Sequence, residues 1–91
     1  MKVEIAGEAR SDVARLRDWL SQRDTGAAAR AIEAIARGLQ TLETFPDRGR
    51  LVKDGVRELP VKFGRYGYVI RYGIRNEGVI VARIFHALES R

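Results

Sequence analysis

The apolar residues of this chain change their spacing near Pro46, and this change limits most strongly the folds that the chain can adopt. Between Ala9 and Leu42 the apolar residues recur at steps of three and four, the spacing of one face of an α-helix. After residue 55 they gather in short runs rich in valine, isoleucine and tyrosine, which are typical of β-strands. A helical half followed by a strand-forming half indicates an α+β fold.

The amino-terminal quarter of the chain predicts a short strand followed by a helix. Val3 and Ile5 alternate with charged residues, as in a strand with one buried face. The helical spacing begins at Ala9 and ends near Arg23, which predicts the first helix. Trp19 borders the apolar stripe of this helix, and we interpret its side chain as packing at the edge of the core rather than as an exposed anchor for a partner.

A second helix is expected to fold back on the first, so that the two form a helical hairpin. Residues 24–26 interrupt the first pattern, and Thr25 is the expected cap of the second helix. Gly38 costs a helix about 1 kcal/mol relative to alanine, and close approach to another backbone would compensate for it. Pro46 ends the helix, and residues 45–50 form a turn that leads into a basic loop. The apolar seam consists of Ala28, Ile32, Ile35, Leu39 and Leu42.

Three strands are expected to follow the helices as an antiparallel meander. Their apolar runs lie at Val56–Val61, Tyr68–Tyr72 and Val79–Phe85. The segments 64–67 and 75–78 between the runs are short and contain glycine, which suits hairpin connections. Pro60 cannot donate to a ladder, so we expect a bend, a bulge or a free edge at this position. Residues 1–91 are therefore expected to form a single domain.

The composition restricts how such a small domain is stabilised, where in the cell it is expected and which partners it favours. The chain contains no cysteine and one histidine, so we predict neither a disulfide nor a metal site nor another cofactor. No apolar run approaches the roughly 20 residues of a membrane helix and no signal peptide is evident, so the cytoplasm is the expected location. The formal net charge of +5 favours acidic partners such as nucleic acid, a ribosome or an acidic protein, although it also serves simply to solvate the surface.

Four sequence motifs, through their order and spacing along the chain, resemble the RelE/ParE toxin superfamily. The motif nearest the carboxyl terminus looks like the paired final strands of the ParE branch, in which an Arg-Glu-Leu strand precedes a Tyr-x-Ile-x-Tyr strand. The similarity covers nearly the whole chain. The motifs are the helix start Ala9-Arg10-Ser11-Asp12, the helix end from Leu42 to Pro46 with Gly49-Arg50, Val56-Arg57-Glu58-Leu59, and Gly67-Tyr68-Val69-Ile70-Arg71-Tyr72 followed by Ile84-Phe85-His86.

This resemblance implies that the protein is the toxin of a bacterial type II toxin-antitoxin pair. A cognate antitoxin, ParD-like or related, is expected to lay an extended or helical segment across it, and the complex, a possible hetero-oligomer, commonly binds operator DNA to repress its own operon. ParE-like members inhibit DNA gyrase, whereas RelE-like members cleave mRNA on the ribosome. We expect a ParE-like gyrase inhibitor. The alternatives are a RelE-like endoribonuclease and an inactive module that only binds antitoxin.

Ribonuclease chemistry would need a cation beside the scissile phosphate and a group that moves a proton. In the nuclease branch an arginine commonly follows the aromatic residue that opens the penultimate strand, but here Val69 follows Tyr68. Lys62 lies where nuclease members often carry a lysine, and Arg65 offers further positive charge. His86 ends the last strand, where some ribonuclease toxins place a general acid or base. A nuclease would therefore use His86 with Lys62 and Arg65, although the tail after His86 lacks the tyrosine and basic cluster of those enzymes.

A gyrase inhibitor would instead act through protein contacts, with no covalent chemistry of its own. Arg57 and Glu58 are neighbours on a predicted strand, so they point to opposite faces and do not share one site unless the strand bulges. The basic loop 48–53 and the carboxyl-terminal strand and tail are the places where we expect contacts with gyrase. The residues predicted to contact target or antitoxin are Arg48, Arg50, Lys53, Arg57, Arg71, Arg83 and His86.

Overall fold

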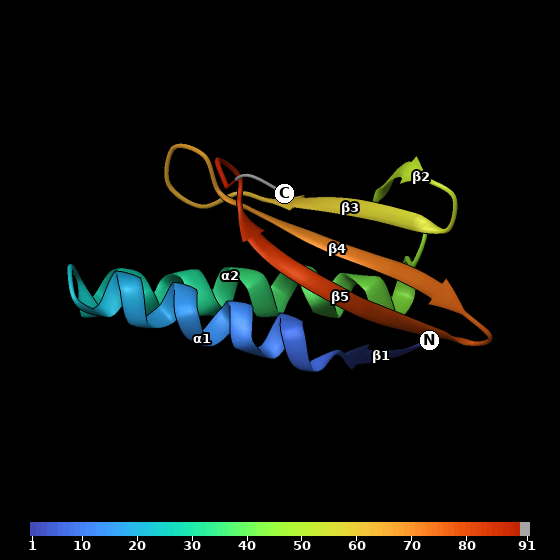
Figure 1. Ribbon diagram of the computed structural model, residues 1–91, viewed down its shortest axis with the longest axis horizontal. Coiled ribbons are helices and arrows are strands. Elements are labelled where there is room, and N and C mark those ends of the chain that lie inside the picture. The colour runs from blue at the N-terminus through green and yellow to red at the C-terminus, as the bar shows by residue number, and fades with distance from the viewer. Residues whose placement is uncertain (90–91) are drawn as a thin grey trace.

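The structure is a computed structural model, which describes residues 1–89 and contains a five-stranded sheet and two helices (Figure 1). The strands lie in the order β1-β5-β4-β3-β2, with β1 parallel to β5 and every other neighbouring pair antiparallel. The expected α+β fold, with its first strand, helical hairpin and meander, is confirmed. The elements are β1 (Lys2–Ile5), α1 (Gly7–Ser21), α2 (Thr25–Thr44), β2 (Arg50–Lys53), β3 (Val56–Val61), β4 (Tyr68–Arg75) and β5 (Gly78–His86).

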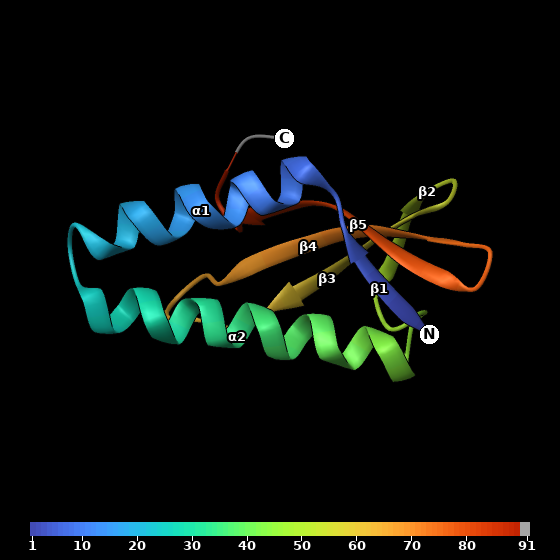
Figure 2. The same cartoon turned by 90° about the horizontal axis from the view of Figure 1, so that it is seen from below.

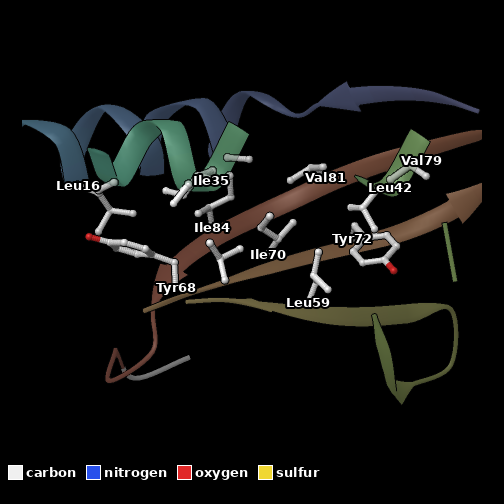
Figure 3. Packing of buried hydrophobic residues seen from close by; sticks show 14 residues of the cluster. Leu16, Ile35, Leu42, Leu59, Tyr68, Ile70, Tyr72, Val79, Val81 and Ile84 are labelled. Atoms are coloured by element: carbon white, nitrogen blue, oxygen red, sulfur yellow. The ribbon is translucent and has the colours of Figure 1, made fainter. Parts of the chain in front are cut away.

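Both helices lie on one side of the sheet, and the core is the layer of side chains between the helices and the sheet (Figures 1 and 2). Figure 3 shows Leu16 of α1 and Ile35 and Leu42 of α2 facing the side chains of the sheet. Ile70 at the middle of β4 and Ile84 on β5 are fully buried beneath them. In the described part of the chain, no helix is long and apolar enough to cross a membrane.

The segment expected to be a basic loop contains a strand, so four strands rather than three follow the helices. Arg50–Lys53 forms β2, which pairs with β3. All four residues of β2 are exposed, so the segment lacks the alternation of buried and exposed positions that identifies a strand from sequence. The pairing reaches β3 only as far as Glu58, which leaves Pro60 at a free edge. The expectation of a free edge at Pro60 is thereby confirmed.

Two details of the second helix differ from what the sequence predicts. The cap is Asp24 and not Thr25, because the backbone of Asp24 is extended and its Oδ1 accepts a hydrogen bond from the Ala27 amide at 3.1 Å. Gly38 does lie at a close approach, but to side chains rather than to backbone. A Cβ at this position would lie 3.0 Å from Cγ2 of Val61 and 3.1 Å from Cδ1 of Ile70. Gly38 therefore lets α2 pack closely on β3 and β4.

Asp12 ties α1 to the sheet through one buried carboxylate that is 4% exposed. Its Oδ2 accepts hydrogen bonds from the Ile84 amide at 2.9 Å and from Nε of Arg83 at 2.8 Å, and its Oδ1 accepts from Nη2 of Arg83 at 3.0 Å. Nη2 of Arg15 adds a longer contact of 3.4 Å. Because β1 pairs with β5 only as far as Val81, the carboxylate satisfies an edge amide that β1 does not reach.

The environment of Asp12 makes its contribution to stability depend on pH. Burial alone would raise the pKa of Asp12, but hydrogen bonds from Arg83 and the Ile84 amide, the charge of Arg83 and the bond from Arg15 hold that pKa below its usual 3.8. The carboxyl pKa is therefore lower in the folded protein than in the unfolded chain. Such a contribution is fully present above about pH 4 and is lost as the pH falls through the folded pKa.

We predict that Asp12→Asn lowers the free energy of unfolding by about 2–4 kcal/mol near neutral pH, because the variant removes the buried charge that pairs with Arg83. The difference between the variant and the unsubstituted protein should shrink as the pH falls through the folded pKa of Asp12, because the carboxyl is then itself protonated. Urea unfolding near neutral pH and at a series of lower pH values measures it. Asp18→Asn on the same helix is the control, since the Asp18 side chain is 69% exposed and should change stability little. Equal losses for the two variants would contradict the prediction.

Candidate functional site

An open groove of about 670 Å³ lies where β5 ends. One wall comes from the second half of α1, another from the loop that joins β3 to β4, and the third from the residues that follow β5. These three segments are far apart in sequence, and the sheet brings them together because Tyr68 at the start of β4 pairs with His86 at the end of β5. We refer to this hollow as the aromatic groove.

Aromatic rings in tilted and edge-to-face contact form the inner surface of the aromatic groove. The ring of Tyr68 lies 5.9 Å from that of Phe63 and 5.7 Å from that of His86, the second contact being edge to face. Tyr66 makes another edge contact with His86 at 6.2 Å. Burial raises the pKa of Tyr68 above its usual 10.0, so its phenol stays neutral near pH 7. Tyr68 therefore contributes apolar packing and not a charge.

The tail after β5 fixes the orientation of His86. Nδ1 of His86 accepts a hydrogen bond from the Leu88 amide at 3.2 Å, and the His86 amide donates to Oε1 of Glu89 at 3.0 Å. Arg15 of α1 holds the same Glu89 carboxylate through two contacts of 3.3 Å. Because Nδ1 accepts, the neutral imidazole carries its proton on Nε2. His86 is thus held as part of an ordered turn that is tied to α1.

The rim of the aromatic groove exposes large apolar side chains. Trp19 is 55% exposed, Tyr66 is 52% exposed and Leu88 is 64% exposed. The interpretation of Trp19 as packed at the edge of the core rather than exposed is wrong. The buried stripe of α1 runs through Leu16, and Trp19 lies beyond its edge with the guanidinium carbon of Arg23 stacked 3.7 Å from the ring centroid. An exposed cluster of this kind is typical of a protein-binding surface.

The three residues that a nuclease would use do not come together. Arg65 and His86 line the aromatic groove, and the Arg65 guanidinium lies 5.6 Å from the centroid of the Tyr66 ring. Lys62 instead lines a separate groove between α2 and β3. Two arginines, Arg15 and Arg65, therefore share the aromatic groove with the histidine, and the Arg15 guanidinium is engaged by the Glu89 carboxylate. The predicted lysine lies elsewhere.

Arg71 and Arg83 lie on the face of the sheet opposite the helices. They are paired in the register of β4 and β5, directly beside the buried pair Ile70 and Ile84. Because neighbouring residues on a strand point to opposite faces, the arginines face away from the core. Their guanidinium groups lie 4.9 and 5.1 Å from the ring centroid of Phe85. Each also binds a carboxylate, Arg71 that of Glu58 at 2.8 Å and Arg83 that of Asp12 at 2.8 Å. Both arginines thus have structural roles, Arg71 within the sheet and Arg83 between β5 and α1.

The other predicted contact residues surround β2. Arg57 donates to two carbonyl oxygens in the turn after α2, at 3.1 and 2.8 Å, so it holds this turn against the sheet. Arg48 donates to a threonine hydroxyl of α2 at 2.9 Å. Arg50 and Lys53 are exposed on β2. These four residues lie outside the aromatic groove, of which His86 is the one predicted contact residue.

Sequence reasoning missed the aromatic character of this site. Trp19 was interpreted as packing at the edge of the core. Tyr66 lies in the connection 64–67, which the sequence marks only as a hairpin loop, and Phe63 directly precedes it. Aromatic residues in a short glycine-containing loop were the available signal. Among the described residues, no group of three or more histidine, cysteine, aspartate and glutamate side chains could hold a metal ion. The groove is suited to hold apolar side chains of another protein.

Comparisons with known proteins agree along nearly the whole chain. The family described as the ParE toxin of the type II toxin-antitoxin system, parDE, matches residues 3–91. Toxin RelE3 of Caulobacter vibrioides is 43% identical over 89 residues, covering 98% of this chain and 97% of the relative. Toxin RelE1 of the same organism is 42% identical over 89 residues, covering 98% and 96%.

The fold has a counterpart among solved structures. A chain described as the chromosomal ParDE TA system from P. aeruginosa superposes with a TM-score of 0.83 over 96% of both chains, at 19% sequence identity. The matching family carries the name ParE, while the two similar toxins carry the name RelE. Names alone therefore do not separate the two branches.

The exposure of Trp19 predicts how its fluorescence behaves. The chain contains one tryptophan, so the whole indole emission reports on the aromatic groove. We predict that acrylamide quenches this emission readily in the isolated protein, and that Arg23→Ala increases the quenching by uncovering one face of the ring. Blue-shifted emission that resists acrylamide would instead support a tryptophan packed in the core.

Proposed function

The chain belongs to the ParE toxin family of type II toxin-antitoxin systems, and on this basis we propose that it arrests growth by binding and inhibiting DNA gyrase. Inhibition would act through protein contact, with no covalent chemistry by the toxin. A cognate antitoxin, ParD-like or related, would neutralise it. Gyrase as the target would place the toxin in the cytoplasm, and the toxin-antitoxin complex would bind operator DNA through the antitoxin.

The separation of the cations from His86 is the observation that carries this proposal. Cleavage of a phosphodiester needs a proton-moving group and several positive charges around one phosphate. Arg65 and Arg15 line the groove with His86, but Arg15 is engaged by Glu89. Lys62 lines another groove, Arg71 is paired with Glu58, and Arg83 is paired with Asp12 of α1. Such a distribution supports binding rather than phosphoryl chemistry.

We place the target contact in the aromatic groove. Tryptophan and tyrosine side chains dominate the energetics of protein interfaces, and Trp19 and Tyr66 are each about half exposed here beside Leu88. Arg65 and Arg23 stand over two of these rings and add positive charge to the rim. The net charge of +5 would speed the approach to an acidic surface, while the rings would provide most of the affinity.

A RelE-like endoribonuclease is the second candidate, because His86 and Arg65 share one groove and the outer nitrogen of His86 can donate a proton. Such an enzyme would cleave mRNA on the ribosome and would depend on the imidazole. A third possibility, an inactive module that binds antitoxin, predicts that expression without antitoxin leaves growing cells unharmed.

We predict that the antitoxin-free protein inhibits supercoiling of relaxed plasmid by gyrase in a dose-dependent manner. Tyr66→Ala should raise the concentration needed for half inhibition at least about tenfold, since it removes an exposed ring of the groove. Phe45→Ala is the matched control, because Phe45 is 61% exposed at the end of α2, outside the groove, and its loss should change inhibition little. His86→Asn keeps a side-chain hydrogen-bond acceptor but cannot transfer protons, so inhibition should persist.

The opposite results would identify the alternative. Normal supercoiling in the presence of a protein that still arrests growth would overturn gyrase as the target. Ribosome-dependent mRNA cleavage that His86→Asn abolishes would then establish the endoribonuclease. Equal effects of Tyr66→Ala and Phe45→Ala would overturn the aromatic groove as the contact surface while leaving the target itself intact.

A further inference from the structure

The aromatic groove combines the size and the rings of a site for a small, flat ligand. Its volume of about 670 Å³ lies within the roughly 300–1,000 Å³ of small-molecule sites. Phe63 and Tyr68 lie on its inner surface with 5.9 Å between their ring centroids, and Tyr68 is buried. Trp19 and Tyr66 are about half exposed at the rim. A flat ring system that enters the groove can therefore pack against buried and exposed rings at once.

The charged side chains that line the aromatic groove do not cancel. They are Arg15, Arg65 and Glu89. Arg15 holds the Glu89 carboxylate through two contacts of 3.3 Å, and the same carboxylate accepts a hydrogen bond from the His86 amide at 3.0 Å. Among the described residues 1–89, no carboxylate forms an ion pair with Arg65. The groove therefore retains one uncompensated positive charge, that of Arg65.

Arg65 is placed so that an anion bound to it also meets a ring. Its side chain is exposed on the loop that joins β3 to β4, and its guanidinium carbon lies 5.6 Å from the centroid of the Tyr66 ring. A guanidinium binds a carboxylate through two parallel N–H donors, which fixes the direction of the bound group. A carboxylate attached to a flat ring would thus direct that ring toward Tyr66 and into the groove.

We propose that the aromatic groove binds a small planar aromatic molecule that carries one carboxylate. The carboxylate would bind Arg65, and the ring would pack against Tyr66 and the rings of the inner surface. A nucleic-acid strand fits this charge balance less well, since it brings a negative charge with every nucleotide and the groove leaves one cation uncompensated. The ligand site itself is independent of gyrase as the target. A bound ligand would also exclude the target from the groove, and this consequence rests on the proposed function.

The test is an NMR titration of the isotope-labelled, antitoxin-free protein with 2-naphthoate, a planar aromatic carboxylate. The chain contains one tryptophan, so the single indole N–H cross-peak reports on the rim of the aromatic groove. We expect this cross-peak to move and to saturate with a dissociation constant on the order of 1 mM, as for other ligands of this size. 2-Naphthamide keeps the rings and lacks the charge, so it should bind at least about fivefold more weakly.

Two substitutions separate the contribution of the charge from that of the ring. Arg65→Gln should weaken naphthoate to the level of the amide and leave the amide unchanged, whereas Tyr66→Ala should weaken both ligands by a similar factor. Arg30→Gln is the matched control, since it removes an exposed cation of α2 outside the groove and should change neither. All three side chains are exposed, so the fold should persist, and thermal unfolding checks this.

Three outcomes of the titration would overturn the ligand site. If the acid and the amide bind equally, the groove takes apolar groups of any kind and does not recognise a carboxylate. An indole cross-peak that stays fixed while other signals move would place the ligand elsewhere. A short oligothymidylate that moves the indole cross-peak at lower concentration than naphthoate would assign the groove to nucleic acid instead.

Exclusion of the target is tested separately in the supercoiling assay. Naphthoate at about five times its dissociation constant should raise the toxin concentration needed for half inhibition about sixfold, because only the unoccupied fraction of the toxin can bind gyrase. Unchanged inhibition at this concentration would overturn the exclusion of the target. Because the NMR titration contains no gyrase, a failed supercoiling assay does not alter its result.

Discussion

The buried carboxylate of Asp12 is the interaction on which the placement of α1 over the sheet depends. It binds the Ile84 amide and the Arg83 guanidinium, and these groups belong to β5, the strand that β1 and β4 flank. Arg15 connects the same carboxylate to Glu89, and through it to the turn that orients His86. One charged group thus sets both the seating of α1 and the shape of the aromatic groove.

The sequence predicts those elements whose burial follows a regular period. Both helices and the three strands of the meander have one face against the core, so their apolar spacing reveals them. β2 has no buried residue and escaped detection for that reason. Asp24 was missed as a cap because it and Thr25 are both good capping residues, and only the backbone geometry decides between them. The outward position of Trp19 depends on where α1 meets β5, which local spacing does not encode.

The sequence predicts the site only through one residue, His86, whose position at the end of the last strand is visible without the structure. His86 stands at the end of the last strand in sequence and in structure. The cations that lie in the same groove as His86 depend on the strand register and on the path of the loop between β3 and β4. Arg65 therefore shares the groove with His86, while Lys62, three residues earlier, lines another groove. The carboxylate partners of Arg83 and Arg71 come from α1 and β3, and these contacts give both arginines structural roles. Their contact with target or antitoxin stays a prediction.

The aromatic groove and the groove between α2 and the end of β3 differ in chemistry. The aromatic groove offers exposed rings, whose attraction depends on buried area and is little affected by salt. The open groove between α2 and the end of β3 is lined instead by Arg37, Arg48 and Lys62, whose attraction for an acidic group acts at a distance and weakens with ionic strength. Added salt should therefore weaken contacts at this second groove more than contacts at the aromatic groove.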